Sequence, residues 1–69
     1  MYARMLRKAD HTHRFTIVQT GASGWEVREE EDSRIVRSAR YRDWHRVERA
    51  QMVFARQVAL LEDAGWTEA

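Results

Sequence analysis

The sequence predicts an α+β domain in which a three-stranded antiparallel β-meander packs against one long C-terminal α-helix. Two periods indicate this class, because apolar residues alternate between positions 13 and 41 and recur every third or fourth position after Asp43. A chain of 69 residues has room for one domain. One sheet with one helix on its inner face is the simplest two-layer arrangement of such elements.

The sequence does not decide the structure of the first twelve residues. Met1 to Ala9 is compatible with a short helix, an extra edge strand or a frayed arm. We therefore assign residues 1–12 to an N-terminal arm, disordered or forming an extra short element, and residues 13–69 to the single α+β domain.

Two strands separated by a glycine turn follow. Residues 13–20 and 25–31 each alternate between apolar and polar side chains, which predicts two strands. Residues 21–24 contain two glycines, which reach the positive φ that a chain reversal needs. The residues expected to face inward are Phe15, Ile17, Trp25 and Val27.

A third strand is expected at residues 34–41, after an acidic turn at about residues 30–33. A turn of even length would place Val36 opposite Val27 and Glu26 near Arg37, so that apolar meets apolar and acid meets base. A turn of odd length would oppose Val27 with Arg37. The even turn places these residues on the outer face of the sheet: Arg28, Ile35, Arg37 and Tyr41.

The C-terminal helix has a start signal and a stop signal. The Asp43 carboxylate can accept from the free amides of the first turn, so the helix should begin at Trp44. Gly65 can adopt the left-handed conformation that ends a helix, which would bring Trp66 onto Leu61 in a Schellman motif. The stripe expected to face the core consists of Val47, Ala50, Phe54, Val58 and Leu61.

A second apolar seam on this helix is the candidate interface. The helix should be about 33 Å long and the strands about 25 Å, so the helix is expected to overhang the sheet. A curved sheet could cover both seams in a monomer. Small domains without a disulfide often need a partner subunit, however, which favours a homo-oligomer, a dimer in the simplest case. The seam consists of Val53, Gln57, Leu60 and Ala64.

A basic run through the third strand and the helix start supports an alternative function. Arginines with interleaved aromatic groups are typical of surfaces that track phosphates and stack on bases. Acidic residues at positions 26–32 can neutralise much of this run, and the net charge is only +1. Nucleic-acid binding is therefore less favoured than protein binding. Its candidate contacts are Arg28, Arg37, Arg40, Tyr41, Arg42, Arg46 and Arg49.

The order of three strands and a helix resembles small DNA-binding modules that read the major groove with a three-stranded sheet, such as the arm-type domain of some integrases. The resemblance covers strand order and approximate lengths. It carries no binding residue over to this chain, and we assign no family from it.

Sequence motifs for chemistry are weak. His11 and His13 with Asp10 could hold a transition metal, but a solvated strand entry is the simpler interpretation. The glycines at residues 21–24 lack the Gly-Lys-Ser/Thr ending of a phosphate-binding loop. The carboxylates at residues 29–32 lack an expected pocket. We therefore expect no catalytic residue, metal or cofactor, and a protein that is not an enzyme.

Composition completes the functional prediction. The chain has no cysteine, no stretch near the roughly 20 apolar residues that span a membrane and no apolar run of signal-peptide length at its start. We expect a small cytoplasmic binding module that self-associates and mediates protein–protein interaction, without contact to membranes.

Overall fold

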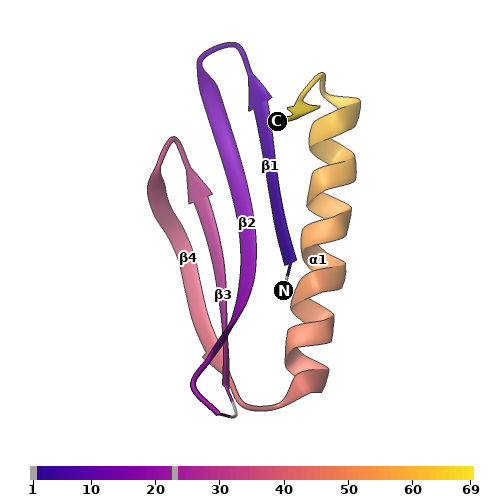
Figure 1. The fold of residues 1–69 in the computed structure, drawn as a ribbon. Helices are drawn as coiled ribbons and strands as arrows, with labels where there is room; N and C mark the ends of the chain where they lie inside the picture. Colours follow the sequence, from indigo (N-terminus) through magenta and orange to yellow (C-terminus); the bar gives the residue numbers. More distant parts are fainter. Residues whose placement is uncertain (1, 23) are drawn as a thin grey trace.

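The computed structural model describes residues 2–22 and 24–69, so Met1 in the expected arm and Ser23 in the expected turn lie outside the described part. One antiparallel sheet is covered on one face by one C-terminal helix (Figure 1). The α+β class is confirmed, but within the described residues the sheet has five strands, four of them long, where three were expected. The elements are β1 (Tyr2–Lys8), β2 (His11–Thr20), β3 (Gly24–Glu31), β4 (Arg34–Tyr41), α1 (Trp44–Asp63) and β5 (Thr67–Glu68).

Strand β1 accounts for most of the difference from the expected meander. It pairs with β2 from Tyr2↔Ile17 to Lys8↔His11, so the segment left open by the sequence forms a strand. The two-residue β5 pairs with the far end of β1 at Leu6 and Arg7. The strand order is β4-β3-β2-β1-β5. Among the described residues, no helix is long and apolar enough to cross a membrane.

The inner face of β2 and β3 is as expected. Phe15, Ile17 and Val27 are buried in the core, and Ile17 pairs with Val27 across the two strands. His13 is buried as well, at 8% exposed, so its interpretation as a solvated strand entry is wrong.

The expected register of β4 is wrong, because a bulge follows the turn. Asp32 and Ser33 form a two-residue turn with φ of 51° and 68°, so the turn is even. The register then shifts by one residue between Glu29 and Glu30. Val27 therefore pairs with Ala39 rather than Val36, and Glu26 pairs with Arg40 rather than lying near Arg37.

The shifted register has a physical reason. Without the bulge, Arg28 would oppose Arg37 and Val27 would oppose Ser38. With it, Glu29 meets Arg37 and Trp25 meets Tyr41. Arg37 and Tyr41 consequently face inward with Val27, not outward as expected, while Ile35 and Val36 are 56% and 49% exposed.

Helix α1 begins and ends where its capping residues predict. Asp43 is the N-cap, and its carboxylate accepts from the His45 N–H at 3.0 Å. Gly65 has a φ of 100°. The N–H of Trp66 donates to the Leu61 carbonyl and that of Gly65 to the Glu62 carbonyl, which is the Schellman pattern.

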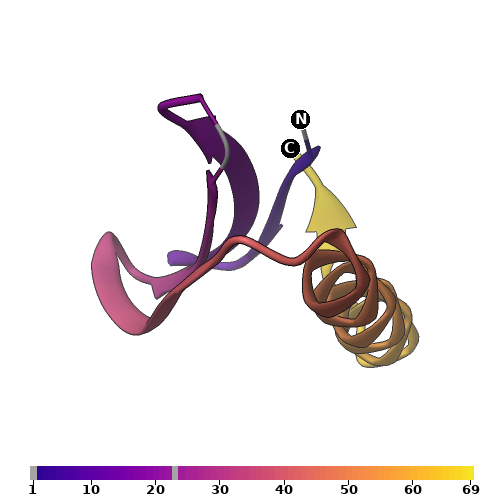
Figure 2. The same cartoon turned by 90° about the horizontal axis from the view of Figure 1, so that it is seen from below.

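The core lies between α1 and the strands nearest to it. It contains Leu6 from β1, Phe15 and Ile17 from β2, Val27 from β3, and Val47, Phe54 and Val58 from α1. The expected overhang is wrong, because β2 has 10 residues and spans about as much as the 20-residue helix. The helix instead fails to cover the sheet across its width. It lies beside β1 and away from β4, so the β4 side of the inner face is uncovered (Figure 2).

Candidate functional site

A groove about 420 Å³ in volume separates α1 from the inner face of β3 and β4. We call it the open groove. It exists because α1 covers the β1 side of the sheet and no other described element covers the β4 side. The sheet contributes Val27, Arg37, Ala39 and Tyr41, and the helix contributes Arg46, Arg49, Ala50, Val53 and Phe54.

The open groove combines an apolar floor with basic side chains. Ala39 and Ala50 are half-buried and small, so they leave room above the buried Val27 and Phe54. Three guanidinium groups lie around this floor, those of Arg37, Arg46 and Arg49. Such a groove suits an occupant that has apolar contacts and negative charge.

The charges of these arginines are only partly compensated. The Arg37 Nε lies 3.9 Å from the Glu29 Oε1, which is too long for a hydrogen bond. Within residues 2–22 and 24–69, no ion pair joins Arg46 or Arg49 to a carboxylate. The groove therefore has a net positive charge available for a partner.

The predicted interface seam borders the open groove. Val53 is 42% exposed and Leu60 is 62% exposed, so the sheet does not cover them. Gln57 is half-buried, and Ala64 is exposed where the helix ends. Met52, which directly precedes Val53, was not among the predicted interface residues and is 68% exposed. We call Met52, Val53 and Leu60 the helix strip.

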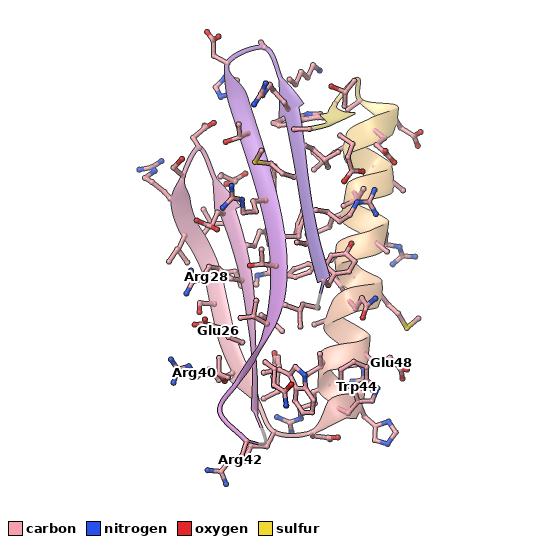
Figure 3. The ribbon with its side chains drawn as sticks, viewed as in Figure 1. Glu26, Arg28, Arg40, Arg42, Trp44 and Glu48 are labelled. Carbon is pink, nitrogen blue, oxygen red and sulfur yellow. The ribbon has the colours of Figure 1, made fainter. Side chains whose placement is uncertain are left out.

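The predicted nucleic-acid contacts divide between two faces of the molecule. Arg28 and Arg40 lie on the outer face on either side of Glu26, at 3.0 and 3.9 Å from its carboxylate oxygens (Figure 3). Arg42 is exposed next to the start of α1. The other four candidates line the open groove: Arg37, Tyr41, Arg46 and Arg49.

An aromatic pair closes the end of the molecule where β4 leads into α1. The rings of Trp25 and Trp44 lie 5.3 Å apart between centroids, and Trp44 is 48% exposed. Trp25 was expected to face inward, but its contact with the first helical residue was not foreseen. The pair ties the start of α1 to the sheet, and the tilted packing of the two rings adds to the burial energy.

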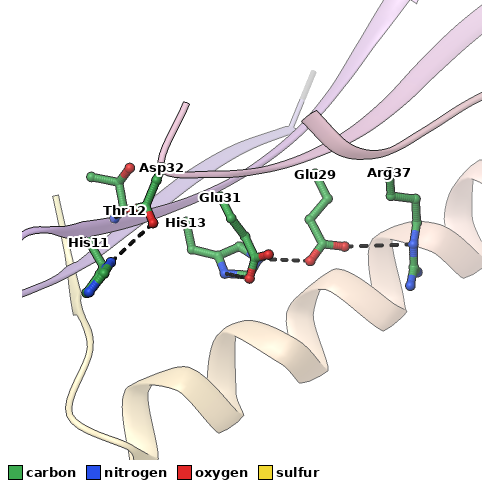
Figure 4. Close-up of polar contacts among 7 residues, drawn as sticks. All are labelled: His11, Thr12, His13, Glu29, Glu31, Asp32 and Arg37. Carbon is green, nitrogen blue, oxygen red and sulfur yellow. Dashed lines mark hydrogen bonds and ion pairs between the residues drawn. The ribbon is translucent and has the colours of Figure 1, made fainter. Parts of the chain in front are cut away.

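A second feature that the sequence did not reveal is a chain of polar contacts across the inner face (Figure 4). The His13 Nε2 lies 2.8 Å from the Glu29 Oε2, and both side chains are 10% exposed. The His13 ring stacks on Phe15 at 4.6 Å. Glu29 therefore links the buried histidine to Arg37 at the open groove.

The second histidine–carboxylate pair, His11 with Asp32, is exposed and lies at the β3–β4 turn. His11 Nδ1 lies 3.1 Å from Asp32 Oδ2, and the N–H of Thr12 donates to Asp32 Oδ1 at 2.9 Å. The Thr12 N–H, and after it His11, hold the pKa of the Asp32 carboxyl below its ordinary value. His11 and His13 thus have different carboxylate partners, and the described residues contain no group of three side chains placed to hold a metal ion.

No family model, curated protein or solved structure matches this chain. The open groove, the helix strip and the charges around them are therefore the features from which a function can be inferred.

Proposed function

We propose that this chain is a small, non-enzymatic protein-binding module that self-associates through the helix strip. The observation that carries the proposal is the exposure of Met52, Val53 and Leu60, which are 68%, 42% and 62% exposed on one side of α1. Neighbouring apolar side chains of this size on one surface are typical of interaction sites.

The size of the surface supports the same proposal. The accessible surface is 5087 Å² for a mass of 8.2 kDa, whereas the scaling for monomeric proteins gives about 4,500 Å². The excess of about 550 Å² is of the order of one partner's share of a small interface. The radius of gyration of 12.4 Å also exceeds the roughly 11 Å of a compact chain of this length.

Helix-to-helix contact is favoured over pairing of the β4 edges. Two copies of β4 placed side by side would bring Arg34, Arg37 and Arg40 near their own copies, which like charges disfavour. Met52, Val53 and Leu60 are themselves uncharged, and the charged side chains that line the same surface have both signs, Arg49, Arg56 and Glu48. A cytoplasmic location, expected from the absence of cysteine, belongs to this proposal as well.

Sedimentation velocity over roughly 1 to 500 µM tests the self-association. We expect a concentration-dependent dimer, which Leu60→Glu converts to a monomer by placing a charge in the contact. Gln51→Glu is the matched control, because Gln51 is exposed on the same helix but lies on the opposite side from Leu60, and it should leave the dimer intact. A chain that stays monomeric throughout, or a Leu60→Glu variant that dimerises like the wild type, refutes the proposal.

Nucleic-acid binding has weaker support as a function. Glu26 lies between Arg28 and Arg40, so two of the seven candidate contacts share a nearby carboxylate. Among the four candidates in the open groove, Tyr41 is the aromatic residue, and it is half-buried. The Phe54 ring in the floor is 2% exposed, so it offers little surface for base stacking.

A further inference from the structure

We propose that the open groove binds an acidic amphipathic α-helix of a partner protein. This inference rests on the role of the chain as a binding module. The groove shares Val53 with the helix strip but not Met52 or Leu60, so peptide binding can fail independently of the self-association. The partner helix would lie beside α1 and cover the inner face of β3 and β4.

The spacing of the elements fits a second helix. Neighbouring strands lie about 4.8 Å apart, so the middle of the β3–β4 pair lies about 10 Å from the middle of the β1–β2 pair. Packed helices have axes 8–10 Å apart. A helix placed over β3 and β4 would therefore contact the sheet and the flank of α1 together, as a second member of the same layer.

The floor of the groove supplies the apolar contacts. Ala39 from β4 and Ala50 from α1 are small and half-buried, so apolar side chains of an added helix can reach Val27 and Phe54 between them. Val53 at the helix flank is 42% exposed and would be covered as well. A helix that enters such a groove presents apolar residues at positions i, i+3 or i+4, and i+7.

The arginines require the flanks of that helix to be acidic. Arg37 lies on the sheet side of the groove, and Arg46 and Arg49 lie on the helix side, where no described carboxylate pairs with the latter two. Strand β3 shows the same complementarity within the chain, since Glu26, Glu29 and Glu31 pair in register with arginines of β4. An occupant with glutamate or aspartate on both flanks would extend this pattern.

A second copy of α1 does not match the groove. Helix α1 carries three arginines (Arg46, Arg49 and Arg56) and three carboxylates (Glu48, Glu62 and Asp63), so it has no acidic excess. Placing it in the groove would set basic groups against basic groups. The occupant is therefore a different, acidic segment, and a single-stranded nucleic acid is the competing source of negative charge.

Fluorescence anisotropy with a labelled synthetic peptide tests the proposal. The probe is an 18-residue helix-forming peptide with leucines on one stripe and glutamates elsewhere, and its counterpart has lysine at every glutamate position. We expect the acidic peptide to bind and the lysine peptide to bind at least tenfold more weakly. Equal binding of the two peptides, or no binding of the acidic one up to about 1 mM at low salt, refutes the proposal.

Variants of this chain locate the binding. The double variant Arg37→Gln, Arg49→Gln should weaken acidic-peptide binding by roughly three- to tenfold, and Ala39→Glu, which adds a carboxylate inside the groove, should abolish it. Arg56→Gln is the matched control, because Arg56 lies on α1 outside the groove lining, and it should have no effect. Circular dichroism of each variant confirms that the fold is kept. Loss of binding in Arg56→Gln, or full binding in Ala39→Glu, refutes the groove as the site.

Two further measurements separate the competing explanations. A 15-nucleotide oligo-dT that binds more tightly than the peptide and displaces it would assign the arginines to nucleic acid and overturn the proposal. The monomeric Leu60→Glu variant should bind the acidic peptide like the wild type, since Leu60 does not line the groove. If self-association fails while peptide binding persists, only the proposed dimer is refuted.

Discussion

The half of the inner sheet face under α1 and the half beside it differ in how deeply they hold their side chains. Under the helix, Leu6 and Phe15 are completely buried. Beside it, Ala39 is half-buried and the Arg37 side chain is 62% exposed. Both halves belong to one continuous sheet, so the difference arises from where the single helix lies and not from the strands themselves.

The closed half, the half under α1, holds the fold together, whereas the open half is the part available for the proposed binding. Aromatic contacts join the elements of the closed half. The ring centroids of Phe15 and Phe54 lie 4.9 Å apart, and those of Tyr2 and Phe54 lie 6.2 Å apart. The open half has small or basic residues at the corresponding depth. Substitutions in the two halves should consequently have opposite profiles, with large effects on stability in the first and large effects on binding in the second.

The strongest test of this division uses neighbouring helix positions. Phe54 is 2% exposed and Val53 is 42% exposed. Phe54→Ala should lower the free energy of unfolding by about 3–5 kcal/mol, enough to unfold much of so small a domain. Val53→Ala should lower it by less than about 1 kcal/mol. Urea denaturation followed by circular dichroism measures both, and similar losses would contradict the division.

Enlarged side chains probe the same division with a smaller effect. Val47 is fully buried, so Val47→Phe should overpack the closed half and cost about 1–3 kcal/mol of stability. Ala39→Val adds a β-branched residue where space is open, and should change stability by no more than about 0.5 kcal/mol. A large loss in Ala39→Val, measured by the same urea curves, would mean that the open groove is filled in solution.

The ends of α1 were predictable from sequence because their determinants are local. Asp43 caps the helix through the amide of His45, two residues away, and Gly65 ends it through bonds within one turn. The faces of β2 and β3 were predictable for the same reason, since alternation alone places Ile17 and Val27 inward. The helix ends and the inward faces of β2 and β3 can therefore be predicted from neighbouring residues alone, without knowledge of distant contacts.

The features that the sequence did not reveal depend on distant partners. The segment at residues 2–8 alternates weakly, and it becomes a strand by pairing along β2. The bulge in β4 depends on which residues of β3 it meets. Likewise, Arg37 and Arg49 are twelve positions apart and share the groove only because β4 and α1 lie side by side there. The predicted interface residues Val53 and Leu60 are exposed, but their role stays a prediction.

The two histidine–carboxylate pairs offer a finer comparison between buried and exposed contacts. His13 and Glu29 are each 10% exposed at the side chain and lie 2.8 Å apart. A double-mutant cycle with His13→Ala and Glu29→Ala should give a coupling energy of about 1.5–3 kcal/mol. The corresponding cycle with His11→Ala and Asp32→Asn should give a smaller coupling, because these side chains are 66% and 50% exposed. Equal couplings would show that burial on the inner face does not strengthen the polar contact.

The smallest expected effect is a change in acid sensitivity at the turn of the open half. The pKa of Asp32 lies below its ordinary value of 3.8, mainly because the Thr12 N–H donates to its carboxylate. A carboxyl whose pKa is lower in the folded state stabilises the fold above the unfolded pKa, and this contribution is lost as the pH falls through the folded value. Asp32→Asn removes this titration while keeping a residue that tolerates the positive φ of 51° at this position.

The urea midpoint measured from about pH 6 to pH 2 checks this expectation. The wild type should lose stability below about pH 4 more steeply than Asp32→Asn. Glu68, whose pKa is lowered by its hydrogen bond with Arg4, keeps a similar acid-sensitive contact between β1 and β5 in both proteins. Asp10→Asn is the control, since the described contacts give Asp10 no hydrogen bond or ion pair, and its curve should follow the wild type. Parallel curves for the wild type and Asp32→Asn would mean that the turn contact contributes equally in the folded and unfolded chain. The acid-sensitive contact of the sheet would then be the one between β1 and β5, not the one at the turn.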